Sequence, residues 1–467
     1  MRIPFDLIAA VFCMEGITQF LQQSANNKPA ESAGVALVAW CGFLLVAWLL
    51  QELVIRHVEW RTRFGYHITG FGGGRHPLVS LGWGIHAGQA VTVVIYASLL
   101  WALKWPLWMS QWPTWFGMSL EKKIGGLEVA SSHVIAALLN LGPFLLAMML
   151  GWLPQRKLKS GIRGQPIPLG AFLSYEARLT WLPMALLLFE AFVRDGFNIL
   201  PAEYSSWAEK PGVDVLLMVL ATGAIWMVGM PLAVIWMWQC EPLPNGELKD
   251  RLLDLTRRSG VKAREILVWG PQNTHLLNAC VLGAWSRYRY VLISPALVNE
   301  LSEQETEAVL AHELGHARYG HLTLLFVMML GLSALLDPVL LLLPESWRGK
   351  PLIETGVIIA VIIMYIRVVY GAIMRRCERE ADLASAELMG TPVPLVAALE
   401  KLAIITGNIR DVWSWHHGSL AERVEAVTAL SSDPDHSRQF HVGLRRFRIA
   451  FTVVTVVALC VQFWARL

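Results

Sequence analysis

Long apolar stretches constrain this chain more than any other feature of its sequence. A helix that crosses a bilayer needs roughly 20 mostly apolar residues. Seven stretches have about that length and composition: residues 34–54, 89–109, 132–153, 214–238, 322–343, 355–374 and 449–465. Hydrophobic residues make up 55% of the chain and charged residues only 16%, which is too apolar for an ordinary soluble protein. We therefore expect a protein built mainly in lipid.

Two further segments bear on the number of spans. Residues 179–193 are apolar but short, and they include Glu190; we count them as the eighth span. Residues 1–22 fit either a ninth span or an amphipathic helix on the membrane surface. We favour the surface helix, because Asp6 and Glu15 would be costly in lipid. The expected fold class is an all-α polytopic membrane protein of about eight transmembrane helices, carrying a small α+β domain.

Two long polar segments, 241–321 and 375–447, are candidates for that domain. Only two spans separate them, so both segments lie on one side of the membrane if both spans cross. The chain then divides into a membrane region of about five spans, a first domain segment, a transmembrane hairpin, a second domain segment and a last span. The boundaries are 1–240, 241–321, 322–374, 375–447 and 448–467.

Basic residues predict the orientation. Loops that fall on the same side as the polar segments are rich in arginine and lysine: Arg56, Arg61, Arg63, Arg75, Arg156, Lys157, Lys159 and Arg163. Basic loops stay in the cytoplasm, so the polar domain is expected to face the cytoplasm. The net charge of +3 is small and argues against a nucleic-acid partner.

The first polar segment ends in the motif HELGHARYGH, residues 312–321. Ser302 and Glu305 form a possible capping box that predicts a helix over 303–319. His312 and His316 then lie one turn apart on one face and can bind one zinc ion, with Glu313 beside it as a general base. H-E-x-x-H also occurs by chance, but here the helix start and the downstream acidic helix support a metal site.

A catalytic zinc usually has a third protein ligand. The best candidate is Glu378 in RRCEREADLASAELMG, residues 375–390, with Asp382 placed to orient a zinc-bound histidine. Glu380 points to another side of that helix and is a poor ligand. The alternative is an ordinary solvated helix face.

Donors for a developing oxyanion come next in the same domain. His417 and Arg423 lie in WHHGSLAERVEAV and are the candidates; an ordinary surface pair is the alternative. His321 fits either a place behind the zinc ligands or a plain helix end.

These motifs together resemble a known family. HELGHARYGH, EREAD and HGSLAER are similar to the integral-membrane zinc metallopeptidases that include the type I CAAX prenyl endopeptidases and the HtpX proteases. The resemblance covers about residues 264–430, and the order of the spans is closer to the CAAX branch. It implies zinc ligation by His312, His316 and Glu378, with Glu313 as the base.

The resemblance also implies roles for further residues. His417 and Arg423 would assist the tetrahedral intermediate. In LLNACVLG, Asn278 and Ala279 would fall on a substrate-binding motif, and RYVLIS, residues 289–294, on the strand before the active-site helix. Two departures stand out. Gly418 occupies a position where the family commonly has proline, and an additional span, 449–465, follows the domain.

The expected function is that of a multi-pass membrane endopeptidase, in a bacterial inner membrane, with one zinc ion per chain. It would hydrolyse peptide bonds of membrane-associated or misfolded proteins or peptides with a zinc-activated water. One alternative is a sensor-transducer protease that cleaves a regulator on ligand binding. Another is an inactive scaffold, which the intact motif set disfavours.

Overall fold

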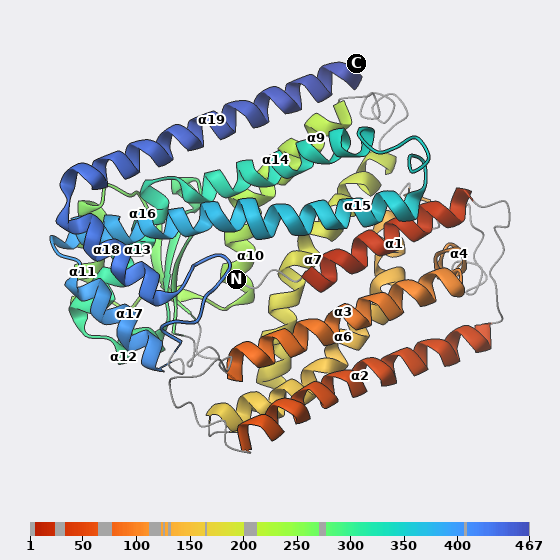
Figure 1. Ribbon diagram of the computed structural model, residues 1–467, viewed down its shortest axis with the longest axis horizontal. Helices are drawn as coiled ribbons and strands as arrows, with labels where there is room; N and C mark the ends of the chain where they lie inside the picture. The colour runs from red at the N-terminus through yellow and green to blue at the C-terminus, as the bar shows by residue number, and fades with distance from the viewer. Residues whose placement is uncertain are drawn as a thin grey trace. The chain divides into compact units, whose positions relative to one another are not determined.

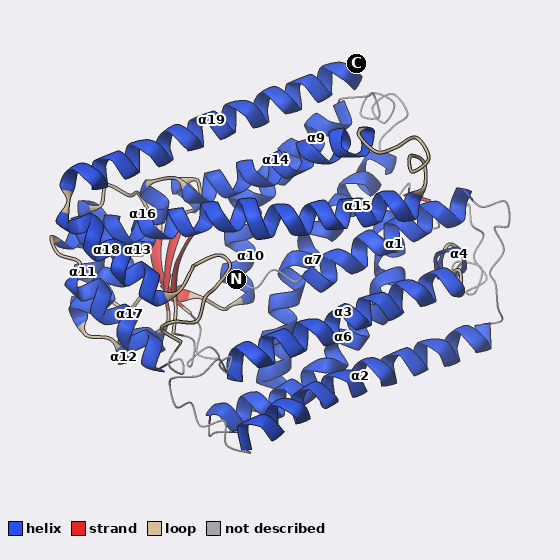
Figure 2. Ribbon diagram, viewed as in Figure 1, coloured by secondary structure: helices blue, strands red, loops and turns tan. Residues whose placement is uncertain are grey.

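The computed structural model describes most of the chain. The described residues are 5–23, 33–63, 77–111, 123–124, 127–128, 132–163, 166–199, 213–269, 277–405 and 409–466. Helices dominate them, and strands form one small sheet and a short hairpin (Figure 2).

The helices form two sets along the chain, one before and one after strand β3, Glu241–Pro242. The first set is α1 Phe5–Gln23, α2 Ala33–Arg63, α3 Pro77–Ala102, α4 Trp105–Met109, α6 His133–Arg163, α7 Leu169–Ile199, α9 Val213–Ala224, η2 Ile225–Gly229 and α10 Met230–Met237. The second set is α11 Glu247–Arg258, η4 Ser286–Tyr288, α12 Pro295–Glu300, α13 Glu303–Arg318, α14 His321–Leu341, α15 Pro351–Met364, η5 Tyr365–Tyr370, α16 Gly371–Met389, α17 Val393–Ile405, α18 Leu420–Ser432 and α19 Pro434–Arg466.

The chain divides into two compact units. The first comprises Met1–Lys210 and Val339–Ala360, and the second comprises Pro211–Pro338 and Val361–Leu467. In the first unit, α2 runs alongside α3 and α6 (Figure 1). Buried aromatic side chains such as Tyr96 and Phe144 fill the space between these helices, with ring centroids 5.3 Å apart.

Helix α1 belongs to this bundle. Ala10, Ile17 and Leu21 lie on one face and are buried in the core of the first unit. A helix that rested alone on the membrane surface would not bury this face in protein, so the surface helix that we favoured does not describe α1. The side chains of Asp6 and Glu15, on which that preference depended, lie outside the described residues.

Apolar length identifies several helices as candidates to cross a bilayer. Among the described residues, four meet this test by length and composition: Val35–His57, His133–Lys157, His321–Leu341 and Pro351–Met389. Shorter apolar helices include Ala87–Ala102 and Ile225–Met237. Several apolar helices of this kind are typical of an integral membrane protein, whereas the count of eight spans stays a prediction.

One expected span is interrupted. We predicted a helix over 89–109, but α3 ends at Ala102 and α4 starts separately at Trp105. Lys104 between them has φ = 49°, in the left-handed region, and Pro106 lies in the first turn of α4. Proline has no N–H to donate to a preceding turn, so it suits the start of a helix and not its interior.

The sheet of the second unit has the strand order β3-β4-β6-β5. Its strands are β3 Glu241–Pro242, β4 Glu265–Val268, β5 Ala279–Leu282 and β6 Tyr290–Ile293, and the separate hairpin of the first unit is β1 Lys123–Ile124 with β2 Leu127–Glu128. β4 and β6 are parallel, and the other neighbours are antiparallel. All four residues of β6 are buried, and the strand leads through α12 into α13, as predicted for residues 289–294.

Candidate active site

Helix α13 begins and ends where the sequence predicts. Ser302 accepts a hydrogen bond from the N–H of Glu305, and the Glu305 carboxylate accepts one from the N–H of Ser302. This capping box satisfies two of the N–H groups that a helix start leaves without partners. The helix ends at Arg318, and Gly320 follows with φ = 69°, a conformation that glycine adopts without strain.

A close approach of α13 and α16 brings the two halves of the site together. A Cβ atom at Gly315 would lie 2.9 Å from Ala384 Cβ and 3.1 Å from Ala381 Cα. The small residues on both helices therefore allow the backbones to touch. Ser385 also donates a hydrogen bond of 2.7 Å to the carbonyl of Ala308 across this contact. Because of this packing, a glutamate on α16 can reach histidines on α13.

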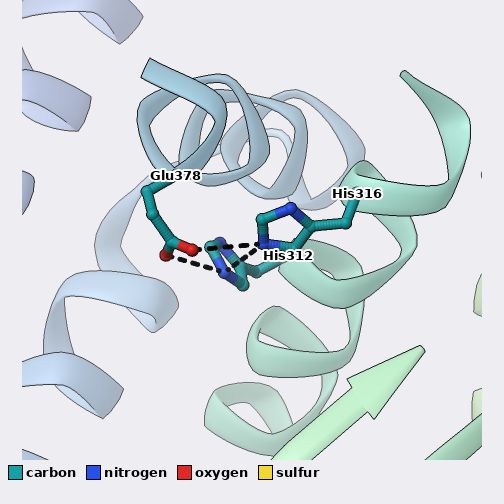
Figure 3. A group of neighbouring side chains, drawn as sticks. All are labelled: His312, His316 and Glu378. Carbon is teal, nitrogen blue, oxygen red and sulfur yellow. Dashed lines mark hydrogen bonds and ion pairs between the residues drawn. The ribbon is translucent and has the colours of Figure 1, made fainter. Parts of the chain in front are cut away.

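His312, His316 and Glu378 converge on one point (Figure 3). The two Nε2 atoms of the histidines lie 3.2 Å apart. The Glu378 carboxylate oxygens lie 3.6 Å from Nε2 of His312 and 3.7 Å from Nε2 of His316. Ligands at about 2.0–2.1 Å in a tetrahedral zinc site are about 3.4 Å from one another. The two nitrogens and the nearest carboxylate oxygens therefore have about the mutual spacing that a tetrahedral zinc ion requires.

The environment of His312 also suits a metal ligand. Nδ1 of His312 lies 2.9 Å from Oδ1 of Asp382, although off the direction of an ideal hydrogen bond. An unprotonated nitrogen would not approach a carboxylate so closely, so we assign the proton to Nδ1, and Nε2 keeps its lone pair toward His316 and Glu378. This carboxylate contact behind a histidine is the usual arrangement around zinc. The residues present therefore fit the metal that the motif predicts.

Glu313 lies beside this group and next to strand β5. Burial raises the pKa of Glu313 to about 7; the negative charge of Glu378 also raises it, while His312, Arg423 and a hydrogen bond from the N–H of Val281 oppose the rise. A carboxyl group with a pKa near neutrality can both accept and release a proton at cellular pH. Among the predicted site residues, Glu313 is thus suited to general-base chemistry.

Arg423, on α18, contacts both acidic residues of α16. Its Nε and Nη2 donate to the two oxygens of Asp382 at 2.9 Å and 2.6 Å, and its Nη1 lies 3.3 Å from Glu378. Burial lowers the pKa of Arg423, but the charges of Asp382 and Glu378 outweigh it and raise the pKa above its usual range. Arg423 therefore holds the carboxylates in place, a contact that the predicted oxyanion role did not include.

His417 contacts one oxygen of Glu378, and Arg423 lies nearer the other. Its Nδ1 is 3.0 Å from Oε1 of Glu378, and its side chain is 44% exposed, so it remains accessible. The neighbouring Gly418 has φ = 75°, which proline cannot adopt because its ring fixes φ near −65°. A glycine, and not the proline common in the family, therefore suits the backbone conformation next to His417.

Asn278 and Ala279 lie at the start of β5, which has no partner on its outer side among the described strands. The N–H of Ser294 donates to the carbonyl of Asn278, so Asn278 faces β6. Antiparallel strands alternate, and the N–H and C=O of Ala279 therefore face the open edge.

The sequence did not predict the residues that contact Glu380. Glu380 faces away from the ligands, as the helix geometry predicted, but His321 lies 2.8 Å from it and 2.8 Å from His316. His441 and Arg448 of α19 also contact Glu380 and were not predicted at all. They lie more than 60 residues after Glu380, so no local sequence pattern links them to it. The only sequence signal for this part of the site was His321 at the end of the HELGHARYGH motif.

The comparisons with known proteins agree with this geometry. Residues 242–438 match the model of peptidase family M48. A protein named "protease HtpX homolog" from Leptothrix cholodnii is 26% identical over 203 residues, covering 41% of this chain and 67% of that protein. The homolog from Aeropyrum pernix is 27% identical over 209 residues, covering 42% and 65%. The homolog from Herminiimonas arsenicoxydans is 27% identical over 180 residues, covering 34% and 59%. The chain therefore spans about two thirds or less of the length of these three relatives.

A solved structure has a similar fold over most of the chain. The crystal structure of S. mikatae Ste24p aligns with 91% of this chain and 99% of its own, at a TM-score of 0.50 and 17% identity. The match shows a similar fold, and its coverage of 91% of the chain extends to helices before residue 242. Together, these findings support peptidase family M48, a family of membrane metallopeptidases, as the family that residues 242–438 resemble.

Proposed function

We propose that this protein is a zinc-dependent endopeptidase embedded in the membrane. The observation that carries the proposal is the convergence of His312, His316 and Glu378 at spacings of 3.2 to 3.7 Å. Zinc bound there would supply Lewis acidity, which lowers the pKa of water toward neutrality and polarises a carbonyl group.

The residues around the ligands carry the proton transfers of peptide hydrolysis. Glu313 would take a proton from the attacking water and return it to the leaving amine, which its pKa of about 7 allows. His417, partly exposed beside Glu378, would donate to the oxyanion. Arg423 would act chiefly by holding Glu378 and Asp382, because its nitrogens already contact both carboxylates.

The open edge of β5 would hold the substrate. An extended peptide can add to such an edge through the N–H and C=O of Ala279, with Asn278 at the same end. Val281, two residues further, already directs its N–H to Glu313. A peptide on this edge would therefore pass the general base, which supports a protein or peptide substrate in an extended conformation.

The location of the site supports membrane-associated or misfolded proteins as substrates. Helix α16, which carries Glu378, continues through η5 from the apolar α15 in one run, Pro351–Met389. We propose about eight spans, with the two domain segments 241–321 and 375–447 at the cytoplasmic surface of a bacterial inner membrane. The arginine and lysine residues of the loops after the first and third spans support this orientation.

The direct test is metal analysis combined with cleavage of an unfolded model protein, on the full chain in detergent. Wild type and Glu313→Gln are compared, with and without chelator. We expect about one zinc per chain in both, because Glu313 is not a ligand, and chelator-sensitive cleavage only in wild type. His312→Ala should lose the metal. If wild type holds no zinc after an attempt to reload it, the proposal is refuted. If wild type holds zinc but does not cleave the model protein, the proposal is restricted to a protease with a narrow substrate range.

A further inference from the structure

His321 is placed behind the zinc ligands by a turn at the end of α13. Gly320, with φ = 69°, reverses the chain so that His321, the first residue of α14, returns to α13. Its side chain is buried, with the residue only 1% exposed. Nδ1 of His321 lies 2.8 Å from Nδ1 of His316, so one of these two nitrogens donates a proton and the other accepts it.

The partner on the other side of His321 decides which nitrogen carries that proton. Nε2 of His321 lies 2.8 Å from Oε2 of Glu380, and a carboxylate only accepts, so His321 donates from Nε2. Neutral His321 then accepts at Nδ1, and His316 must donate from its own Nδ1. The remaining nitrogen of His316, Nε2, therefore keeps its lone pair toward His312 and Glu378.

Glu380 is fully buried and would be costly if its charge had no compensation. Two residues of α19 provide it: Arg448 donates to Oε2 at 2.6 Å, and Nδ1 of His441 lies 3.0 Å from Oε1. Burial lowers the pKa of His441, but Glu380 and Glu387 outweigh it and raise the pKa to about 9. His441 is therefore a cation at neutral pH and stabilises Glu380.

The two histidine ligands are thus supported in the same manner from opposite sides of α16. Asp382 contacts His312 and is held by Arg423 from α18. Glu380 reaches His316 through His321 and is held by Arg448 from α19. The family match ends at residue 438, so both residues of α19 that hold Glu380 lie beyond it.

We propose that His321, Glu380 and Arg448 form a positioning relay that fixes the ring and the protonated nitrogen of His316, and that helix α19 is thereby part of the metal centre. This inference rests on the proposed function, since it concerns the binding of the same zinc ion. His321 and Glu380 touch neither metal nor substrate, so their role is positioning and not catalysis.

The experiment measures metal binding and not cleavage. Zn²⁺ affinity is determined by competition with a chromophoric chelator, and the Co²⁺-loaded protein is examined by visible absorption, which reports ligand geometry. The variants are His321→Phe, which keeps a ring without hydrogen-bonding atoms, and Arg448→Gln. Arg446→Gln is the matched control, because Arg446 is an exposed arginine of the same helix.

We expect His321→Phe and Arg448→Gln to weaken Zn²⁺ binding by about 10- to 100-fold and to change the Co²⁺ spectrum. Arg446→Gln should match wild type in both measurements. Arg448→Lys, which keeps a cation near Glu380, should bind Zn²⁺ more tightly than Arg448→Gln; a purely structural need for the guanidinium would not give this recovery.

The outcomes separate the relay from the proposed function. Wild type that binds no Zn²⁺ would refute both the relay and the proposed function. Wild type that binds Zn²⁺ tightly, with unchanged affinity and spectrum in His321→Phe and Arg448→Gln, would overturn the relay and leave the zinc site standing. If His321→Phe does not fold, Arg448→Gln against Arg446→Gln decides alone, and equal affinity in that pair overturns the proposal.

Discussion

Arg423 binds Asp382 through two hydrogen bonds, at 2.9 Å and 2.6 Å, while its third nitrogen lies 3.3 Å from Glu378. All three side chains are buried, so the guanidinium compensates two carboxylates that water does not reach. Removing one partner of such a buried group costs about 3–5 kcal/mol, because the remaining charge has no compensation.

Arg423→Gln should therefore destabilise the protein, and more strongly in chelator than with Zn²⁺. Bound metal would itself compensate Glu378, so zinc should restore part of the lost Tm. The measurement is thermal unfolding in detergent with and without Zn²⁺. Arg410→Gln is the control, because Arg410 forms an exposed ion pair with Glu400 and its loss should matter little. Equal Tm losses for the two variants would contradict this account of Arg423.

The raised pKa of Glu313 predicts that the stability of the metal-free protein depends on pH. Burial raises its pKa from 4.5 to about 7, so the folded state holds a proton that the unfolded state releases between these values. Stability is then lost as the pH rises through this window. Glu313→Gln cannot ionise, so in chelator its Tm should exceed that of wild type more at pH 8 than at pH 5. The same Tm difference at both values would show that Glu313 has an ordinary pKa.

The sequence predicted the parts of the site that depend on local geometry. Ser302 and Glu305 set the start of α13, and a period of 3.6 residues places His312 and His316 on one face. The same periodicity places Glu378 and Asp382 on one face of α16 and Glu380 on another. These predictions needed no knowledge of the tertiary packing, and the observed positions of all these side chains agree with them.

The remainder depends on contacts between distant segments. Whether Glu380 has a cation beside it depends on where α19 packs, and nothing near residue 380 encodes that. The interruption at Lys104 was missed for another reason. The apolar composition that predicts a span does not reveal a residue in the left-handed conformation before Pro106. For α1, apolar residues on one face fit a membrane surface and a helix bundle equally, and only the packing separates them.

The open edge of β5 predicts that proline substitutions at neighbouring residues affect substrate binding and folding differently. Ala279→Pro removes an N–H that faces the edge, where proline is tolerated, whereas Cys280→Pro removes one that faces β6. We expect Ala279→Pro to lose less Tm than Cys280→Pro and to keep its Zn²⁺ affinity, but to lose most cleavage through a raised KM. Cys280→Pro should unfold. Cleavage with normal KM in Ala279→Pro would show that substrate does not pair with this edge.

The turn next to His417 gives the last prediction. Gly418 has φ = 75°, its N–H donates to the carbonyl of Ser414 at 2.9 Å, and a Cβ would lie 2.7 Å from a Glu422 oxygen. Alanine there is strained by about 1–2 kcal/mol, and the strain should move His417. Because the three ligands lie on α13 and α16, Zn²⁺ affinity should remain within a few-fold of wild type while kcat falls at least about tenfold.

Gly390 supplies the matched control for this variant. It ends α16 with the same φ of 75°, but no atom lies within 4 Å of a Cβ placed there. Gly390→Ala should therefore lose a similar amount of stability through backbone strain and still cleave at the wild-type rate. If both variants lose kcat equally, the effect follows general destabilisation and the position of His417 does not limit the reaction. If only Gly418→Ala loses it, the turn positions a group that acts on the substrate.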